Sequence, residues 1–255
     1  MIKLHNITAG YNRVEIIKNI NMDFEEGSIT SIIGKNGCGK TTLLRTASNL
    51  LKPFRGEITI GGRDISRIPN KELAKKVSFL PQLRTVPNIT VHNLVMHGRY
   101  PYLGFSRTPQ KRDKEIVKKA IEHMELDNLI NKNVHELSGG QRQKVYLAMI
   151  LAQDTDIIFL DEPTTYLDIN HQLEILEVIK NLKHMGKTII MVLHDLNSAL
   201  SSSDRICLMD KGEMVIHDTP QAVFDSREID RIFRISSSQV STGDEGTRQY
   251  IFYLK

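Results

Sequence analysis

The sequence contains little cysteine and no long apolar segment. Among its 255 residues only Cys38 and Cys207 are cysteines, and because they lie far apart they predict neither a disulfide framework nor a cluster of metal ligands. The longest unbroken apolar run, Val145 to Ala152, is far shorter than the ~20 residues of a membrane-spanning helix. The charged start of the chain has no apolar signal-peptide segment, so we expect the protein to stay in the cytosol.

An excess of one charge is also absent. The 34 basic and 30 acidic residues give a formal net charge of +4 and are interspersed, as in Lys111 to Glu115. This pattern is typical of a solvated mixed surface, and it argues against a nucleic-acid partner. With 40% hydrophobic residues and no repeat or low-complexity tract, residues 1–255 are expected to form one domain whose core needs no disulfide or structural metal.

The order of the predicted elements indicates an α/β fold. Ser28 to Ile33 is a predicted strand that ends at Gly34, and a helix pattern follows from Lys40 to Leu51. Ile157 to Leu160 and Thr188 to Leu193 are apolar runs rich in β-branched residues, which is typical of parallel strands buried on both faces.

Helix patterns and hairpins occupy much of the remaining chain. Apolar residues recur with a period near 3.6 residues from Leu173 to Met185 and from Asp113 to Leu126. Residues 86–145 are therefore predicted to form a helical subdomain, inserted into a core of residues 1–85 and 146–235. Antiparallel strands are predicted at Ile2 to Thr8, Ile16 to Phe24 and Glu57 to Ile60, with hairpin turns at Asp210 to Gly212 and, within a C-terminal hairpin of residues 236–255, at Asp244 to Gly246.

A glycine-rich loop carries the strongest motif. It matches G-x-x-x-x-G-K-[ST] between a predicted strand and a predicted helix, a context in which backbone N–H groups surround a phosphate. We expect Lys40 to reach the β and γ phosphates, Thr41 to bind Mg²⁺ and Thr42 to bond the α phosphate. The alternative is a plain glycine turn beside a surface lysine. The nucleotide-binding candidates in this region are Gly34, Lys35, Asn36, Gly37, Cys38, Gly39, Lys40, Thr41 and Thr42.

Two carboxylates follow the predicted strand Ile157 to Leu160. Asp161 and Glu162 should emerge at its C-terminal edge, where ligands bind in open α/β sheets. Asp161 would hold Mg²⁺ through water, and Glu162 could take the proton of an attacking water. A solvated turn is the alternative interpretation, and the glycine-rich loop is what favours catalysis.

The segment Leu137-Ser138-Gly139-Gly140-Gln141 precedes another helix pattern. Ser138 is a good N-cap residue, and the two glycines expose backbone N–H groups, which together predict a second anion site. A plain capped helix start is the alternative, although each glycine in a first turn costs about 1 kcal/mol relative to alanine.

Together, the glycine-rich loop, the Leu137 to Gln141 segment, the strand ending in Asp161-Glu162 and a histidine after the next strand resemble the ATP-binding cassette (ABC) ATPases. The resemblance covers nearly the whole chain. It implies a phosphate-loop NTPase (RecA-like) core with an antiparallel β subdomain and an inserted helical subdomain. It also implies ATP hydrolysis, with ATP and Mg²⁺ as cofactors.

The resemblance assigns further roles by position. Gln82 falls in the family's glutamine loop, which contacts Mg²⁺ or water and senses the membrane partner, and His194 matches the histidine that touches the γ phosphate. Asp168 matches the loop that links two active sites, and Tyr11 matches the aromatic residue that stacks on adenine. Without the family, His194 would more often be an exposed loop histidine. Cys38 could be a nucleophile, but with only a helix N-terminus nearby to lower its pKa it is interpreted as a spacer.

The resemblance also implies partners. In the family, the signature segment of one subunit closes over the nucleotide of another, so Ser138, Gly139, Gly140 and Gln141 would complete the site of a second copy in a head-to-tail homodimer. The segments His97 to Phe105 and Thr164 to Gln172 resemble ATPase subunits of bacterial importers for iron-siderophore chelates, haem and cobalamin. We favour an iron chelate.

An importer implies two integral-membrane permease subunits, indirectly a substrate-binding protein, and a peripheral location at the cytoplasmic face of the membrane. Tyr100, Tyr102 and Phe105 either line the groove for the permease coupling helices or are ordinary core and turn residues. A soluble cassette acting on ribosomes or DNA is a rival, but the chain lacks a second cassette or a coiled-coil insertion. The signature segment argues against a small-molecule kinase.

Overall fold

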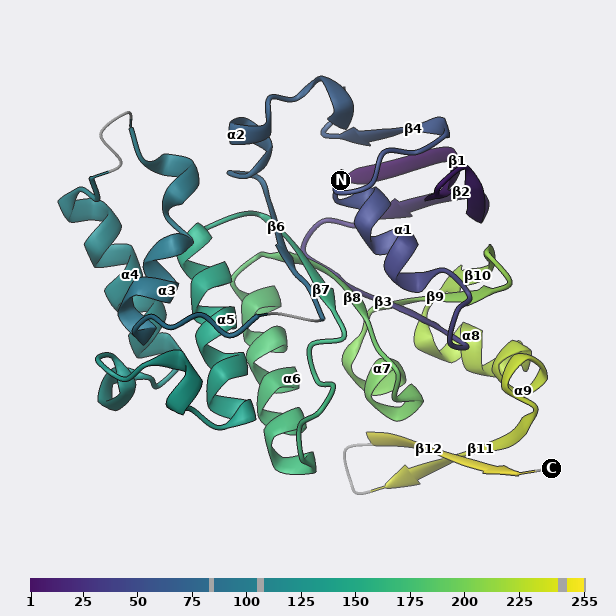
Figure 1. Ribbon diagram of the computed structural model, residues 1–255. Helices are drawn as coiled ribbons and strands as arrows, with labels where there is room; N and C mark the ends of the chain where they lie inside the picture. Colours follow the sequence, from purple (N-terminus) through teal and green to yellow (C-terminus); the bar gives the residue numbers. More distant parts are fainter. Residues whose placement is uncertain (83–84, 105–107, 243–246, 255) are drawn as a thin grey trace. The chain divides into compact units, whose positions relative to one another are not determined.

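The computed structural model describes residues 1–82, 85–104, 108–242 and 247–254, and it divides into two compact units (Figure 1). The first unit comprises Met1–Arg67 and Thr188–Lys255, and the second comprises Ile68–Lys187. The expected division into a core, a helical subdomain and a C-terminal hairpin stays a prediction.

An antiparallel sheet begins the first unit. Its strands β1 (Ile2–Tyr11), β2 (Val14–Phe24), β4 (Arg55–Ile60) and β5 (Arg63–Asp64) follow the order β2-β1-β4-β5, which confirms the strands predicted here. The β1–β2 turn uses Asn12 and Arg13 at φ angles of 49° and 65°, as a two-residue hairpin loop requires. A short 3₁₀ turn, η1 (Ile65–Arg67), follows β5.

The parallel strands of the first unit are buried on both faces. Strand β3 (Ile29–Gly34) pairs in parallel with β8 (Thr188–Val192) on one side and with β9 (Arg205–Asp210) on the other. Every residue of β3 and β8 is buried, since helix α1 (Lys40–Ala47) packs against both strands and α7 (Leu196–Ser202) packs against β3. Strand β10 (Glu213–Asp218) adds to β9 through the predicted hairpin.

Helix α1 ends at Ala47, earlier than the predicted Leu51. Asn49 adopts a left-handed conformation with a φ of 63°, and the N–H groups of Leu50 and Leu51 turn back to the carbonyl oxygen of Arg45. These hydrogen bonds occupy a carbonyl group at the end of the helix and stop α1 there. The apolar pattern in the sequence continues to Leu51, beyond the last helical residue.

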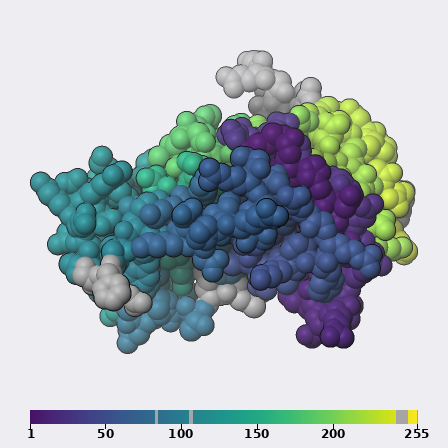
Figure 2. Space-filling view, turned by 90° about the horizontal axis from the view of Figure 1, so that it is seen from above, coloured from purple at the N-terminus to yellow at the C-terminus, as the bar shows by residue number. Residues whose placement is uncertain are grey.

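The C-terminal part of the first unit packs against α7 and the β9–β10 hairpin. It contains α8 (Pro220–Asp225), α9 (Glu228–Phe233) and the antiparallel strands β11 (Ile235–Thr242) and β12 (Thr247–Leu254). The antiparallel pairing of β11 with β12 is what a C-terminal hairpin requires, and the predicted turn residues Asp244 to Gly246 lie outside the described residues. In the space-filling view the purple N-terminal strands adjoin yellow-green residues of the same unit (Figure 2). Strand β10 packs against β2, and Arg205 of β9 binds Glu25, the residue after β2, at 2.6 Å.

The second unit combines two parallel strands with helices. Strand β6 (Val77–Leu80) pairs with β7 (Ile157–Asp161), and α3 (Val91–His97), α4 (Lys111–His123) and α5 (Gly139–Gln153) pack against one another. The other helical elements are α2 (Asn70–Leu73), α6 (Ile169–His184), η2 (Tyr100–Tyr102), η3 (Asp127–Leu129) and η4 (Val134–Glu136). None of the helices in the described ranges combines the length and apolar character that crossing a bilayer requires.

A buried ion pair ties the three packed helices together. Arg99 donates from Nε to Asp113 at 3.0 Å and from Nη1 to the carbonyl oxygen of Ala152 at 2.9 Å. At Gly98 the chain approaches α5 so closely that a Cβ would lie 2.3 Å from the carbonyl oxygen of Met149. The residues predicted as a helical subdomain therefore have a packed interior of their own.

Candidate nucleotide site

The glycine-rich loop lies between β3 and α1 and is pressed against neighbouring backbone. Gly34 and Gly39 have φ angles of 151° and 104°, which side chains rarely allow. A Cβ at Gly34 would lie 2.3 Å from the carbonyl oxygen of Met209, and one at Gly39 would lie 2.6 Å from Cγ2 of Ile17. Only glycine fits these positions, so the loop conformation is fixed by its surroundings in the first unit.

The β9–β10 turn supports this loop from behind. The N–H group of Gly212 donates to the carbonyl oxygen of Cys38 at 3.0 Å, and the carbonyl oxygen of Gly212 accepts from the N–H group of Lys18 at 2.9 Å. A Cβ at Gly212 would lie 2.2 Å from the carbonyl oxygen of Ile16. The sequence predicts this turn but contains no signal that it contacts a loop more than a hundred residues earlier.

The start of α1 presents backbone N–H groups and a buried lysine. Lys40 is 6% exposed, and its Nζ donates to the carbonyl oxygens of Gly34 and Lys35 at 2.8 and 3.0 Å. No side chain in the described part of the chain caps this helix, whose N-cap is Gly39. Thr42 is buried and Thr41 is half-buried in the first turn. This is the arrangement of a phosphate-binding loop.

Cys38 is a buried thiol within the same loop. Burial raises the pKa of the Cys38 thiol above its usual value. The reactive thiolate is therefore scarce at neutral pH, which supports the interpretation of Cys38 as a spacer.

Two further candidates of the first unit are exposed. The ring of Tyr11, at the end of β1, is 41% exposed, as a stacking platform for a base would be. His194 is exposed and follows β8 by two residues.

The second unit gathers the candidate catalytic groups. Asp161 is the last residue of β7 and is buried, and Glu162 follows it with a φ of 52°, a conformation that a residue with a side chain adopts only at some cost. Gln82 and Thr165 both donate to Oε2 of Glu162, Thr165 at 3.0 Å. The structure thus brings Gln82 and Glu162 together, and it adds Thr165, which as an ordinary loop threonine carried no signal in the sequence.

The signature segment, Leu137 to Gln141, is a self-capped helix start. The Ser138 hydroxyl accepts from the N–H group of Gln141 at 3.2 Å, and Oε1 of Gln141 accepts from the N–H group of Ser138 at 3.2 Å. Ser138 and Gly139 are exposed, whereas Gly140 is buried. The predicted N-cap role of Ser138 is confirmed.

The aspartate loop, Thr165 to Asp168, leads into α6. Asp168 is the N-cap of α6, so this helix begins before the predicted Leu173. Its carboxylate accepts from the backbone N–H group of His171 at 3.0 Å and contacts Nδ1 of His171 at 2.8 Å. These two hydrogen bonds, the backbone one foremost, lower the pKa of Asp168.

The proposed magnesium ligands are all hard oxygen donors. Thr41, Gln82 and Asp161 offer a hydroxyl, an amide oxygen and a single carboxylate. The described residues contain no group of three or more His, Cys, Asp or Glu side chains that could hold a metal ion alone. This donor set fits Mg²⁺ that takes its other ligands from water and phosphate, as it usually does in nucleotide sites.

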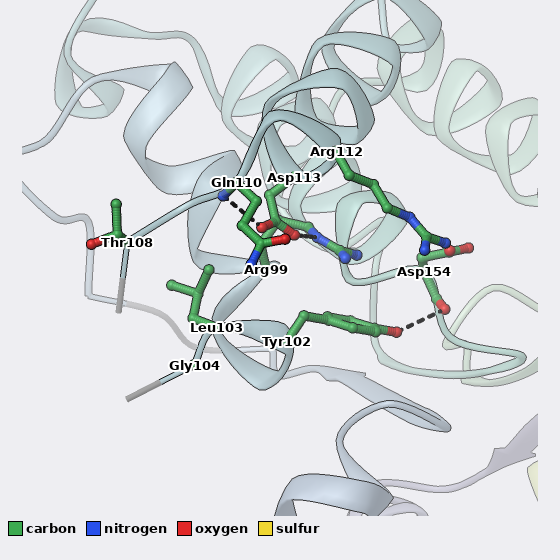
Figure 3. Close-up of a pocket in the computed structure, with 9 residues that line it drawn as sticks. All are labelled: Arg99, Tyr102, Leu103, Gly104, Thr108, Gln110, Arg112, Asp113 and Asp154. Atoms are coloured by element: carbon green, nitrogen blue, oxygen red, sulfur yellow. Dashed lines mark hydrogen bonds and ion pairs between the residues drawn. The ribbon is translucent and has the colours of Figure 1, made fainter. Parts of the chain in front are cut away.

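Tyr102 lines a polar pocket of ≈ 230 Å³ in the second unit, next to Arg99 and Asp154 (Figure 3). Its ring lies 3.8 Å from the Arg99 guanidinium, and its hydroxyl donates to the carbonyl oxygen of Asp154 at 3.3 Å. Tyr100 is 56% exposed. Phe105, the third aromatic candidate for a permease groove, lies outside the described residues.

Comparisons with known proteins identify the family of the chain. A family model described as ABC transporter matches residues 17–165. The probable siderophore transport system ATP-binding protein YusV of Bacillus subtilis is 41% identical, over 92% of this chain and 86% of that protein. The ferric enterobactin transport ATP-binding protein FepC of Escherichia coli is 39% identical, over 94% and 90%.

Solved structures share the fold. A chain of a metal-chelate type ABC transporter in an inward-facing conformation superposes with a TM-score of 0.87 over 100% of this chain and 98% of that chain, at 23% identity. The dimeric bacterial ABC transporter cassette MJ0796 has a TM-score of 0.75 over 86% and 99%, at 31% identity. The predicted phosphate-loop NTPase fold is therefore confirmed.

Proposed function

Because the chain belongs to the ABC transporter family and is an ABC ATPase, we propose that it energises the uptake of an iron chelate of the siderophore type. The similarity to siderophore-transport ATPases over more than nine-tenths of the chain carries this proposal. The glycine-rich loop, the signature segment and the Asp161-Glu162 pair supply the chemistry that those relatives' names imply.

Each candidate residue has a defined task toward ATP. The loop Gly34 to Thr42 binds the phosphates through backbone N–H groups and Lys40, and Tyr11 stacks on adenine. Glu162 accepts the proton of the attacking water, and its hydrogen bonds from Gln82 and Thr165 orient the carboxylate for this task. His194 contacts the γ phosphate.

Magnesium is part of the proposal. Thr41, Gln82 and Asp161 are the residues that would hold it, directly or through water, and bound Mg²⁺ would neutralise the charge that develops on the transferred phosphoryl group.

Two copies of the chain are needed for two complete sites. Ser138, Gly139, Gly140, Gln141 and Asp168 of one copy complete the site of the other, and the exposure of Ser138, Gly139 and Asp168 suits contact with a second molecule. A 31% identical cassette is dimeric. Closure of the dimer on ATP and its reopening after hydrolysis form a ligand-driven population shift.

The dimer acts on two integral-membrane permease subunits at the cytoplasmic face of the membrane, and through them on a substrate-binding protein. Tyr100 and Tyr102 are candidates for contact with the permease, since one is exposed and the other borders a pocket.

Uptake by cells that lack this chain tests the proposal. Loss of radiolabelled ferric-siderophore uptake, restored by the wild-type chain and not by Glu162→Gln, is the expected result. Loss of haem or cobalamin uptake instead would assign the same ATPase to another cargo. Normal uptake of all three, together with co-sedimentation of the chain with ribosomes, would overturn the importer assignment.

A further inference from the structure

We propose that His171 is a positioning residue that clamps the signature segment to the aspartate loop, so that both act as one unit on the nucleotide of a second copy. This inference rests on the proposed function, because it assumes that these two segments act on a partner's ATP. His171 lies in the Thr164 to Gln172 segment that resembles the importer ATPases, but that resemblance gives it no role of its own, and its contact with Gly140 depends on the packing of α5 against α6.

One face of the imidazole ring fills the space beside Gly140. A Cβ at Gly140 would lie 2.0 Å from Cδ2 and 2.6 Å from Cγ of His171, far closer than a Cβ atom comes to another carbon that it is not bonded to. The ring therefore occupies the place that any other residue at position 140 would need. This contact explains why Gly140 is buried although its neighbours Ser138 and Gly139 are exposed.

The same residue holds the aspartate loop. Its backbone N–H group donates to Oδ1 of Asp168 at 3.0 Å, and Nδ1 of its ring lies 2.8 Å from Oδ2. Both carboxylate oxygens of Asp168 thus contact His171, and these hydrogen bonds lower the pKa of Asp168. The His171 side chain is 36% exposed, so its bond to Asp168 competes with water and depends on the ring being held by Gly140.

Other contacts join the same two elements farther from their exposed ends. Nε2 of the buried Gln143 donates to the carbonyl oxygen of Pro163 at 2.6 Å, and Lys144 of α5 pairs with Glu174 of α6 at 2.9 Å. At the exposed end itself, Leu167 of the aspartate loop lies 3.6 Å from the position of a Cβ at Gly139. These contacts hold α5 and the loop after β7 together without His171, whereas His171 sets the relative position of Ser138 and Asp168.

Substitution of His171 should separate binding from turnover. The nucleotide bound by the same chain is held by the glycine-rich loop of the first unit, which His171 does not contribute to. His171→Ala should therefore leave the dissociation constant for ATP unchanged while kcat falls by up to about 100-fold, the usual effect of misplacing a catalytic group by about 1 Å. His171→Asn should recover part of the loss, because its amide keeps a donor near the position of Nδ1.

The matched control is His184→Ala, the same substitution at the exposed C-terminal end of α6, which should leave kcat and stability unchanged. Wild-type hydrolysis, abolished by Glu162→Gln, first establishes the ATPase activity that the proposed function requires; if the wild type hydrolyses no ATP, the proposed function fails. If the wild type is active and His171→Ala has the wild-type kcat, the inference about His171 is wrong. If His171→Ala loses ATP affinity and thermal stability along with kcat, His171 has a merely structural role, and this result would also overturn the inference.

Mixed dimers show which site His171 serves. His171→Ala and wild-type chains are each mixed with a large excess of Lys40→Ala chain, and turnover is measured per chain with an intact glycine-rich loop. The two mixtures should be equally active, because in both the intact loop is completed by a signature segment that retains His171. Lower activity of the mixture that contains His171→Ala would mean that His171 acts on the site of its own chain, contrary to the proposal.

Discussion

Two helix starts of the molecule are rich in glycine, and they are built differently. Helix α1 begins at Gly39 with no side-chain cap among the described residues, and it holds a buried lysine in its first position. Helix α5 begins at Ser138, whose hydroxyl and whose partner Gln141 satisfy each other. An uncapped start leaves its N–H groups for a phosphate, whereas a self-capped start is stable without one. The start of α1 is therefore suited to bind the nucleotide of its own chain. The start of α5 is suited to contact the nucleotide of a second copy only when the two copies come together.

The largest effect is expected at Glu162, the candidate catalytic group, which belongs to neither helix start. Glu162→Gln should lower ATP turnover by about 10² to 10⁴-fold, the usual effect of losing a general base, and should leave ATP binding intact. Steady-state hydrolysis and equilibrium binding measure the two effects. Since glutamine keeps the shape of the side chain, the variant should accumulate as an ATP-bound dimer in size-exclusion chromatography. Turnover at the wild-type level would remove Glu162 from the mechanism.

Removing the buried lysine should affect binding. Lys40→Ala deletes a charged donor to phosphate, and a hydrogen bond to a charged group contributes about 1.5–3 kcal/mol, so ATP affinity should fall by roughly 10- to 100-fold. Titration calorimetry measures the affinity, and Lys52→Ala, at an exposed position outside the glycine-rich loop, serves as the control. Unchanged ATP affinity in Lys40→Ala would contradict the proposal that the start of α1 binds the nucleotide of its own chain.

Substitution of Ser138 at the start of α5 should leave ATP affinity unchanged. Ser138→Ala removes the N-cap and should cost about 1 kcal/mol of stability, measured by denaturant unfolding, while ATP affinity stays at the wild-type value. Ser138→Arg should additionally prevent dimer formation in the Glu162→Gln background. A loss of ATP affinity in monomeric Ser138→Ala would show that the two helix starts do not differ in the way described.

The smallest effect is expected at Cys38. Because burial raises the pKa of its thiol, Cys38 should react slowly with a maleimide at pH 7, and Cys38→Ala should keep wild-type turnover. Mass spectrometry of the intact chain counts the modified thiols before and after unfolding. Rapid labelling of the folded protein, or loss of turnover in Cys38→Ala, would refute the spacer role.

Local patterns predicted most strands and the glycine-rich loop, because both depend on residues close together in the chain. The phosphate loop needs only a strand, its glycines and a helix in sequence, and β3 and α1 confirm this order. Helix ends were less predictable: Asp168 starts α6 before its apolar pattern begins, and Asn49 stops the chain from continuing α1.

The residues that sequence patterns missed take their roles from contacts that only the folded chain makes. Thr165 bonds Glu162 through the shape of one loop, Gly212 supports Cys38 from a distant hairpin, and His171 meets Gly140 only because α5 and α6 pack together. None of these side chains or turns differs locally from an ordinary one. Tertiary packing alone gives them their place.

The β9–β10 hairpin matters for anyone who modifies this protein. Its tip, Lys211-Gly212, resembles the short polar turns that are chosen for epitope tags or fluorescent-protein insertions. Yet its backbone holds Cys38 on one side and Lys18 on the other. An insertion there would disturb the backbone bond that holds Cys38 in the glycine-rich loop, so a label placed at this turn should weaken the proposed nucleotide site.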